Sequence, residues 1–180
     1  MIKARVARMQ HFAIEVSDTD QSIAFYREVL GFKLTERHKP HEIAEIPVSL
    51  TFMRIAEQHH ELVLVHNPAK AYTKRVLPQD DHTGPPSFHH FAMECDSRED
   101  WLSVLKHVQS LDIPLVRGPV VHSFTDPRGD GSWGENEAFY FLDPDGHRIE
   151  IFCDMATIEP DGVYRNSKGE RLEEVVADEV

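Results

Sequence analysis

The chain has 180 residues, of which 41% are hydrophobic and 28% are charged, an ordinary composition for one globular domain. Its 31 Asp and Glu residues outnumber 19 Lys and Arg residues, so the formal net charge is −12. This balance argues against nucleic acid or an anionic membrane as a partner, because both are bound through basic residues. No apolar run approaches the ~18 residues of a membrane span, and the first residues lack a signal peptide's apolar stretch, so we expect a cytoplasmic protein.

The first predicted element is a strand over residues 9–16, in which polar and apolar residues alternate. Alternation places His11 and Glu15 on one face of the strand and the apolar residues on the other. A helix is expected next, because Ser17 or Asp18 can cap its first turn.

The helix is predicted to end at Gly31, because glycine readily adopts the left-handed conformation that terminates a helix. Three strand-like runs follow it, at residues 32–38, 47–55 and 61–65. The order of strand, helix and three strands makes a βαβββ module, which we bound as residues 8–66.

The second half of the chain repeats the first. After a turn-rich linker at residues 67–87, residues 88–95 read FHHFAMEC, which matches QHFAIEV at residues 10–16. A helix near residues 97–111 is predicted to turn four apolar residues inward, namely Trp101, Leu102, Leu105 and Val108. We bound this second module as residues 88–155.

The last two strands are predicted at residues 138–142 and 147–153, joined by a DPDG turn. Residues 118–137 form a long Gly/Pro/Asp-rich stretch, which we expect to be a functional or disordered loop. The tail, residues 156–180, is polar, and its stretch GERLEEVVADEV, residues 169–180, is predicted as a short helix or as unstructured. Residues 1–155 are therefore predicted to be one α+β domain of two βαβββ modules.

The repeat also carries the first functional signal. His11 and His90 occupy matched positions on the strand face that does not bury against a helix, and Glu61 and Glu150 each precede apolar strand residues. Imidazole and carboxylate without thiolate suit Fe(II), Mn, Ni or Zn. The simpler interpretation is a histidine without a special role and an ordinary ion pair between Glu150 and Arg148.

The stretches HFAIEVSDTDQSIAFYREVLGF, HHFAMEC and DPDGHRIEIF resemble the vicinal-oxygen-chelate superfamily. That group contains glyoxalase I, fosfomycin-resistance proteins, methylmalonyl-CoA epimerase and the type I extradiol dioxygenases. The resemblance implies paired modules that close a half-barrel around one divalent metal. It implies His11, His90 and Glu150 as metal ligands, and Glu61 as a fourth ligand in the glyoxalase-like branch.

Within the superfamily, the chain most resembles the extradiol ring-cleaving dioxygenases. His60 resembles the catalytic base of that group, and Tyr140 stands ten residues before Glu150 as in its signature. The stretch GPVVH resembles the group's Gly-Pro-x-x-His element, which indicates His122 as a further catalytic residue. The resemblance implies Fe(II) as cofactor, a catecholic substrate and O2 as reactants, and a homodimer. Phe124, Trp133 and Phe139 are candidates for an aromatic substrate pocket.

Two other functions stay open from the sequence. Neighbours on a regular strand point to opposite faces, so His60 and Glu61 cannot both face a metal. Glu61 facing the metal would favour a glyoxalase- or epimerase-type enzyme with four ligands. A bleomycin-resistance-type protein that only binds a small molecule is the non-enzymatic alternative, although it would not need the set His11, His90 and Glu150.

Overall fold

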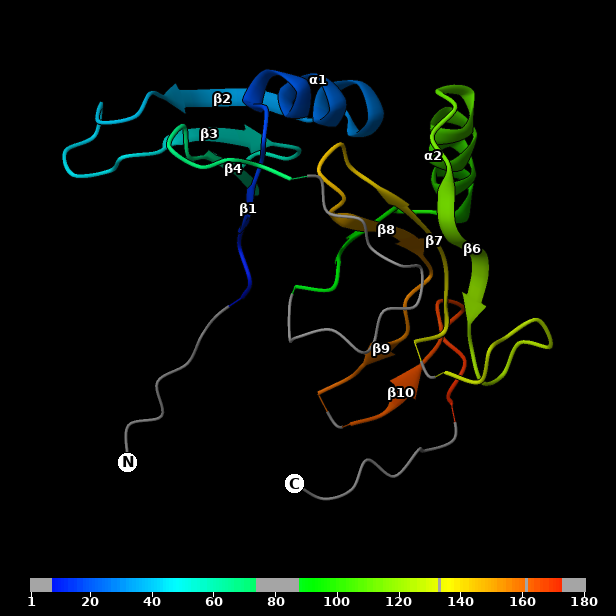
Figure 1. Ribbon diagram of the computed structural model, residues 1–180. Helices are drawn as coiled ribbons and strands as arrows, with labels where there is room; N and C mark the ends of the chain where they lie inside the picture. The colour runs from blue at the N-terminus through cyan, green and yellow to red at the C-terminus, as the bar shows by residue number, and fades with distance from the viewer. Residues whose placement is uncertain (1–7, 74–87, 133, 161, 173–180) are drawn as a thin grey trace, which may run out of the picture. The chain divides into compact units, whose positions relative to one another are not determined.

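The computed structural model describes residues 8–73, 88–132, 134–160 and 162–172 (Figure 1). The chain divides into two compact units, the first comprising Met1–Val76 with Asp143–Gly146 and the second Leu77–Leu142 with His147–Val180. Among the described residues, no helix combines the length and the apolar character needed to cross a membrane.

Within its described residues, the first unit contains one helix and a four-stranded sheet, in the order β1 (Phe12–Glu15), α1 (Thr19–Leu30), β2 (Lys33–His38), β3 (Ser49–Arg54) and β4 (Leu62–His66). The spatial order of the strands is β1-β4-β3-β2, with β1 and β4 parallel and the other pairs antiparallel.

The second unit repeats this plan with β5 (Phe91–Glu94), α2 (Arg98–Ser110), β6 (Leu115–His122), β7 (Asn136–Leu142) and β8 (Arg148–Cys153). Its strand order, β5-β8-β7-β6, has the same pattern of parallel and antiparallel pairs. The duplicated βαβββ order and the α+β class predicted from the sequence are therefore confirmed.

Helix α1 begins and ends where its local chemistry predicts. The side chain of Asp18 accepts hydrogen bonds from the backbone of Asp20 and Gln21, which stabilises the helix start by about 1 kcal/mol. Gly31 ends the helix with φ of 71°, a conformation that costs glycine little. Tyr26 of this helix is fully buried, and its ring lies 5.8 Å from that of Phe32.

Helix α2 packs on one face of the second sheet through Trp101, which is 1% exposed. The indole nitrogen of Trp101 donates a hydrogen bond to the carbonyl of Ile151 at 3.0 Å, and its ring lies 5.5 Å from that of Phe139. The prediction that Phe139 lines a substrate pocket is therefore wrong, because its ring belongs to the core beneath α2. Phe124 is 61% exposed, and Trp133 lies outside the described residues.

The predicted DPDG turn is present and is held against α1 in the first unit. The Tyr26 hydroxyl donates a hydrogen bond to Asp143 at 2.9 Å, and the backbone N–H of Ser17 donates to Asp145 at 3.0 Å. Gly146 completes the turn with φ of 89°. The turn therefore anchors the start and the middle of α1.

Two sequence predictions differ from the structure. Strand β6 extends to His122 and β7 begins at Asn136, so both ends of the predicted loop 118–137 belong to strands, which pair with each other. Two short strands, β9 (Thr157–Ile158) and β10 (Tyr164–Arg165), pair as an antiparallel ladder in the tail, for which no strand was predicted. Residues 74–87 of the linker and 173–180 of the tail lie outside the described residues.

Candidate active site

The second unit gathers four of the predicted site residues into one hydrogen-bonded chain. Glu150 lies on β8, is 6% exposed, and is the centre of the chain. Its Oε2 lies 3.0 Å from Nε2 of His90, and its Oε1 accepts a hydrogen bond from the Tyr140 hydroxyl at 2.8 Å. A buried carboxylate is costly unless its oxygens are paired, and these two contacts meet that need. Arg148, the simpler candidate partner for Glu150, instead lies over the Tyr140 ring at 4.9 Å.

His122 extends the chain beyond Tyr140. Its Nε2 lies 2.9 Å from the Tyr140 hydroxyl, and its Nδ1 lies 2.6 Å from Oδ2 of Asp130. Asp130 also approaches Arg117, with 3.5 Å between the guanidinium and the carboxylate. The structure thus brings His122 to the site and adds Asp130, which the sequence analysis did not single out.

Two pKa shifts indicate which of these hydrogen-bonded side chains donates and which accepts. Burial and the neighbouring Glu150 carboxylate raise the pKa of Tyr140 well above its usual value, so the phenol keeps its proton and can donate. Burial alone would raise the pKa of Asp130, but hydrogen bonds from Ser132 and His122 outweigh it and lower the pKa to about 2. Asp130 is therefore an ionised acceptor at neutral pH.

The loop after β6 is shaped so that Asp130 reaches His122. Oδ1 of Asp130 accepts hydrogen bonds from the backbone N–H and the hydroxyl of Ser132, at 3.0 and 2.7 Å. A side chain at Gly129 would overlap the carbonyl oxygen of Ser123, so only glycine fits this close approach. The Glu135 carboxylate closes the loop by accepting a hydrogen bond from the Ser123 hydroxyl at 2.6 Å.

The first unit places His11 beside His60, with their ring centroids 4.7 Å apart. Gln10 links the two residues, because its side-chain oxygen lies 2.5 Å from Nδ1 of His11 and its nitrogen donates to the backbone carbonyl of His60. An Nδ1–H that donates to Gln10 leaves the lone pair of His11 on Nε2, the arrangement that a metal-binding imidazole needs.

Of the neighbours His60 and Glu61, it is His60 that lies against His11, because β4 begins only after them. The strand starts only at Leu62, so His60 precedes the regular alternation, and its ring lies against those of His11 and Phe52. Glu61 accepts a hydrogen bond from the backbone N–H of Ile55 at 2.9 Å. Burial and the nearby rings of His11 and His59 lower the pKa of His60, which favours the neutral imidazole at neutral pH.

Strand register identifies the true counterpart of Glu150 in the first module. Ala92 on β5 pairs with Glu150, and Ala13, which holds the same place in the repeat, pairs with Val63. Glu61 lies two residues before that position. The first module therefore carries an apolar residue where the second carries its carboxylate.

The residues fit a divalent metal ion in their chemistry. Two histidines and one carboxylate are the donor set of non-haem Fe(II) sites. Two donors in adjacent positions of an octahedral ion with bonds of about 2.1 Å lie about 3 Å apart, and the donor atoms of His90 and Glu150 are separated by 3.0 Å. His11 belongs to the other unit. Among the described residues, no three His, Cys, Asp or Glu side chains are grouped as a metal site, so the three-ligand set stays a prediction.

Sequence reasoning missed Asp130 and Gln10 for different reasons. Asp130 stands eight residues after His122 in an irregular loop, where no periodicity relates the two side chains. Gln10 directly precedes His11, and its position next to a candidate ligand was the signal that could have identified it.

Comparison with known proteins agrees with the duplicated fold. Residues 8–151 match the family described as the Glyoxalase/Bleomycin resistance protein/Dioxygenase superfamily. Metapyrocatechase of Pseudomonas sp. (strain CF600) is 24% identical over 149 residues, which cover 83% of this chain and 40% of that protein. The chain therefore spans less than half the length of that relative.

Two further proteins are similar over most of their own length. Lactoylglutathione lyase of Pseudomonas putida is 25% identical over 158 residues, with 78% of this chain and 82% of that protein covered. The crystal structure of the fosfomycin resistance protein FosX of Listeria monocytogenes, complexed with Mn(II) and sulfate, superposes with a TM-score of 0.51 at 15% identity, covering 83% of this chain and 93% of that one. This last likeness concerns the fold.

Proposed function

Because the chain belongs to the Glyoxalase/Bleomycin resistance protein/Dioxygenase superfamily, we propose that it is a metal-dependent extradiol dioxygenase that opens a catecholic ring with O2. The observation that carries this proposal is the chain of side chains from Asp130 through His122 and Tyr140 to Glu150, with contacts of 2.6, 2.9 and 2.8 Å. Such a chain supplies hydrogen-bond donors and proton carriers beside a candidate metal ligand, as ring cleavage requires.

The proposed ligands are His11, His90 and Glu150, and the proposed metal is Fe(II). When bound, Fe(II) would supply positive charge, redox chemistry with O2 and open positions that hold the two reactants next to each other. Zn, the least suited of the alternatives, has no redox chemistry. The 3.0 Å between His90 and Glu150 supports these two residues as neighbours on one ion.

The proposed catalytic residues would accept or return protons, or donate hydrogen bonds. His60 would accept a phenolic proton from the substrate, because a neutral imidazole has a free lone pair for it. Tyr140 keeps its proton, which it donates to Glu150 here, and would donate it to a substrate oxygen instead once Glu150 ligates the metal. His122 would hold or return a proton at Nε2, the nitrogen that lies 2.9 Å from the Tyr140 hydroxyl.

The rival reaction is a glyoxalase-type isomerisation with Glu61 as a fourth ligand, in line with the likeness to lactoylglutathione lyase. Two observations weigh against it. The Glu61 carboxylate accepts the Ile55 N–H, and Val63 holds the register position that corresponds to Glu150. A three-ligand site leaves more open positions, which suits a substrate that binds through two oxygens together with O2.

The test is oxygen consumption by protein loaded anaerobically with Fe(II) and given catechol, 3-methylcatechol, 4-methylcatechol and 2,3-dihydroxybiphenyl. We expect O2 uptake with at least one of them and a yellow ring-opened product. Zn-loaded protein should consume none. No uptake with any of the four would rule against the dioxygenase, and turnover of the methylglyoxal–glutathione adduct by Ni- or Zn-loaded protein would establish the glyoxalase type in its place.

A matched pair of variants separates the two ligand sets. Glu150→Gln should lower the bound Fe(II), measured by elemental analysis after desalting, at least tenfold. Glu61→Gln should leave it unchanged, because Glu61 is proposed to hold only the loop. Equal losses in both variants would favour four ligands. The homodimer stays a prediction that sedimentation velocity can test.

A further inference from the structure

The connection between β6 and β7, residues 123–135, is longer than a reversal of the chain requires. Antiparallel strands are commonly joined by about 2–5 residues, so the additional residues need contacts of their own to hold one conformation. In the structure they return to the end of β6, where Oδ2 of Asp130 lies 2.6 Å from Nδ1 of His122. The contacts that fix this loop therefore decide where the partner of His122 lies.

Ser123, the first residue of the loop, is the centre of these contacts. It is 2% exposed, and its hydroxyl oxygen accepts hydrogen bonds from the backbone N–H groups of Thr125 and Asp126, at 3.0 and 2.8 Å. Its carbonyl oxygen accepts the N–H of Gly131 at 3.0 Å, which brings the chain back beside its own start. Asp130 is the residue before Gly131, so the contacts of Ser123 set its position.

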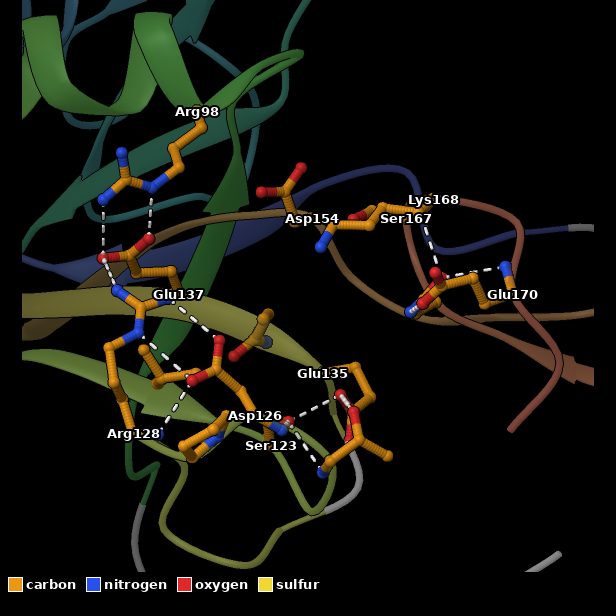
Figure 2. Close-up of a pocket in the computed structure, with 15 residues that line it drawn as sticks. Arg98, Ser123, Asp126, Arg128, Glu135, Glu137, Asp154, Ser167, Lys168 and Glu170 are labelled. Carbon is orange, nitrogen blue, oxygen red and sulfur yellow. Dashed lines mark hydrogen bonds and ion pairs between the residues drawn. The ribbon is translucent and has the colours of Figure 1, made fainter. Parts of the chain in front are cut away.

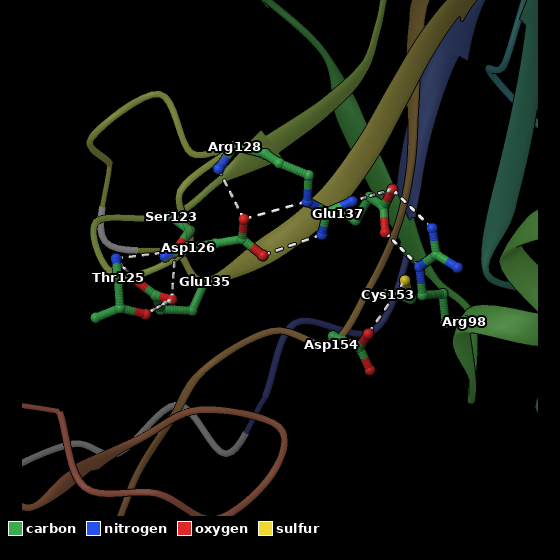
Figure 3. Close-up of polar contacts among 9 residues, drawn as sticks. All are labelled: Arg98, Ser123, Thr125, Asp126, Arg128, Glu135, Glu137, Cys153 and Asp154. Carbon is green, nitrogen blue, oxygen red and sulfur yellow. Dashed lines mark hydrogen bonds and ion pairs between the residues drawn. The ribbon is translucent and has the colours of Figure 1, made fainter.

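Glu135, the last residue of the loop, accepts the hydroxyl proton of Ser123 (Figure 3). Its Oε2 accepts hydrogen bonds from the hydroxyls of Ser123 and Thr125, at 2.6 and 2.8 Å, and its Oε1 accepts the backbone N–H of Phe124 at 2.8 Å. A hydroxyl has one donor and two lone pairs, so all three positions of the Ser123 hydroxyl are occupied. Glu135 thereby joins the two ends of the loop.

The carboxylate of Glu135 is ionised, which strengthens these hydrogen bonds. Burial alone would raise the pKa of Glu135, but the hydrogen bonds from Ser123, Thr125 and Phe124 outweigh it and lower the pKa. Glu135 is therefore a charged acceptor at neutral pH, and hydrogen bonds to a charged acceptor are stronger than those to a neutral one.

The backbone of Glu135 lies in the left-handed region, with φ of 53°. This conformation is costly for a residue with a side chain, and it persists where surrounding contacts hold it. Glycine would adopt it more readily, but it would leave the hydroxyls of Ser123 and Thr125 without their acceptor. The chain thus keeps a carboxylate at a position whose backbone favours glycine.

Arg128 makes a second contact between the loop and β7, in the wall of a cavity of the second unit (Figure 2). Its guanidinium lies 3.7 Å from Glu137, whose carboxylate is bound more closely by Arg98, at 2.6 and 3.2 Å. The Arg128 side chain is 60% exposed, and an exposed ion pair of this length contributes little. The contact between the buried Ser123 and Glu135 is therefore the stronger anchor of the loop.

We propose that Glu135 is a positioning residue for His122. Through Ser123 it holds the loop in the conformation in which the Asp130 carboxylate accepts a hydrogen bond from Nδ1 of His122. Without Glu135, the Ser123 hydroxyl and the N–H of Phe124 lose their acceptor, the ends of the loop separate, and Asp130 moves away from the imidazole. The effect on catalysis rests on the proposed function, in which His122 holds or returns a proton, whereas the effect on the imidazole tautomer does not.

The test is the position of the proton on His122 in the Glu135→Gln variant, read from long-range ¹H–¹⁵N spectra of the full-length protein without metal or substrate. Glutamine has the same length, but it is uncharged and offers one oxygen in place of two. We expect the share of His122 protonated at Nδ1 to fall by about half or more, and the amide of Gly131 to exchange with solvent about tenfold faster. A wild-type tautomer, with or without faster exchange, would overturn the proposal.

Two further variants make the test specific. Ser123→Ala removes the hydroxyl between Glu135 and the loop without adding bulk, and it should reproduce the change of tautomer, which keeps the test open if Glu135→Gln does not fold. A wild-type tautomer in a folded Ser123→Ala protein would contradict the proposed route. Arg128→Gln is the matched control, since it changes an exposed side chain of the same loop, and it should leave the tautomer unchanged. An equal change in Arg128→Gln would refute a particular role of Glu135.

Oxygen uptake separates this proposal from the proposed function. If the wild-type protein cleaves a catechol, Glu135→Gln should lower kcat about tenfold and leave KM and bound Fe(II) unchanged. If the wild-type protein cleaves none, the tautomer still decides the role of Glu135, because its measurement requires neither metal nor substrate.

Discussion

The carboxylate of Asp130 lies 2.6 Å from Nδ1 of His122, while Nε2 of the same ring lies 2.9 Å from the hydroxyl of Tyr140. An ionised carboxylate can only accept, so Nδ1 must carry a proton. Free imidazole prefers the proton on Nε2, so the contact imposes the less common tautomer. In its neutral form, His122 therefore presents a lone pair on Nε2 toward Tyr140, where it competes with Oε1 of Glu150 for the single proton of the phenol.

We expect Asp130→Asn to remove the preference of His122 for the tautomer with the proton on Nδ1. Long-range ¹H–¹⁵N spectra report which imidazole nitrogen carries the proton, and comparison with His122→Gln assigns the signals. The wild-type protein should show a protonated Nδ1, and the Asn variant a mixture shifted toward protonated Nε2. An unchanged tautomer would mean that Asp130 has no positioning role. This measurement requires no activity, so it stands apart from the test of the dioxygenase.

Tyr140→Phe should lower kcat for ring cleavage about 100-fold, because the phenol is the group between Glu150 and His122 that can donate a hydrogen bond. Bound Fe(II) should be unchanged, since Glu150 and His90 remain. The control is Tyr72→Phe, which removes a tyrosine hydroxyl that contacts Glu15 in the first unit. A wild-type kcat in the Tyr140→Phe variant would show that Tyr140 has no role in the mechanism.

Tyr26→Phe should destabilise the protein by about 2 kcal/mol, because it deletes the donor to Asp143, which is 4% exposed. Urea unfolding followed by circular dichroism measures the loss. Tyr72→Phe serves again as the comparison and should cost less, because the Tyr72 residue is only half-buried and its hydroxyl donates to the exposed carboxylate of Glu15. Equal costs for the two variants would show that the buried contact adds nothing particular to stability.

Asp126 provides a prediction on pH. Hydrogen bonds from the Arg128 side chain and backbone lower the pKa of this carboxyl to about 2. A depressed folded-state pKa means that the stabilisation is complete above the ordinary value of about 4 and is lost as the pH falls toward 2. Carboxyl ¹³C NMR should give a midpoint of about 2, and Arg128→Gln should raise it toward 4. A midpoint near 4 in the wild-type protein would contradict the Arg128 contact.

Much of the fold could be read from the sequence because its signals are local. Period-2 alternation in residues 9–16 assigned His11 and Phe12 to opposite faces, and glycine and the DPDG stretch marked a helix end and a turn. Phe139 was a wrong prediction that the same alternation could have prevented. Its neighbour Tyr140 was expected to face the site, so Phe139 had to face the core.

By itself, the sequence determined the duplicated βαβββ order and the faces of the strands, because periodicity, capping and turn chemistry act over a few residues. Its resemblance to a known family supplied the set of candidate ligands. Only the tertiary structure decided that His60 lies against His11, that Glu61 turns to the Ile55 N–H, and that Asp130 holds His122. These contacts arise where the backbone leaves its regular geometry, at the start of β4 and in the loop after β6. There the direction of a side chain depends on partners distant in the sequence, which no local pattern records.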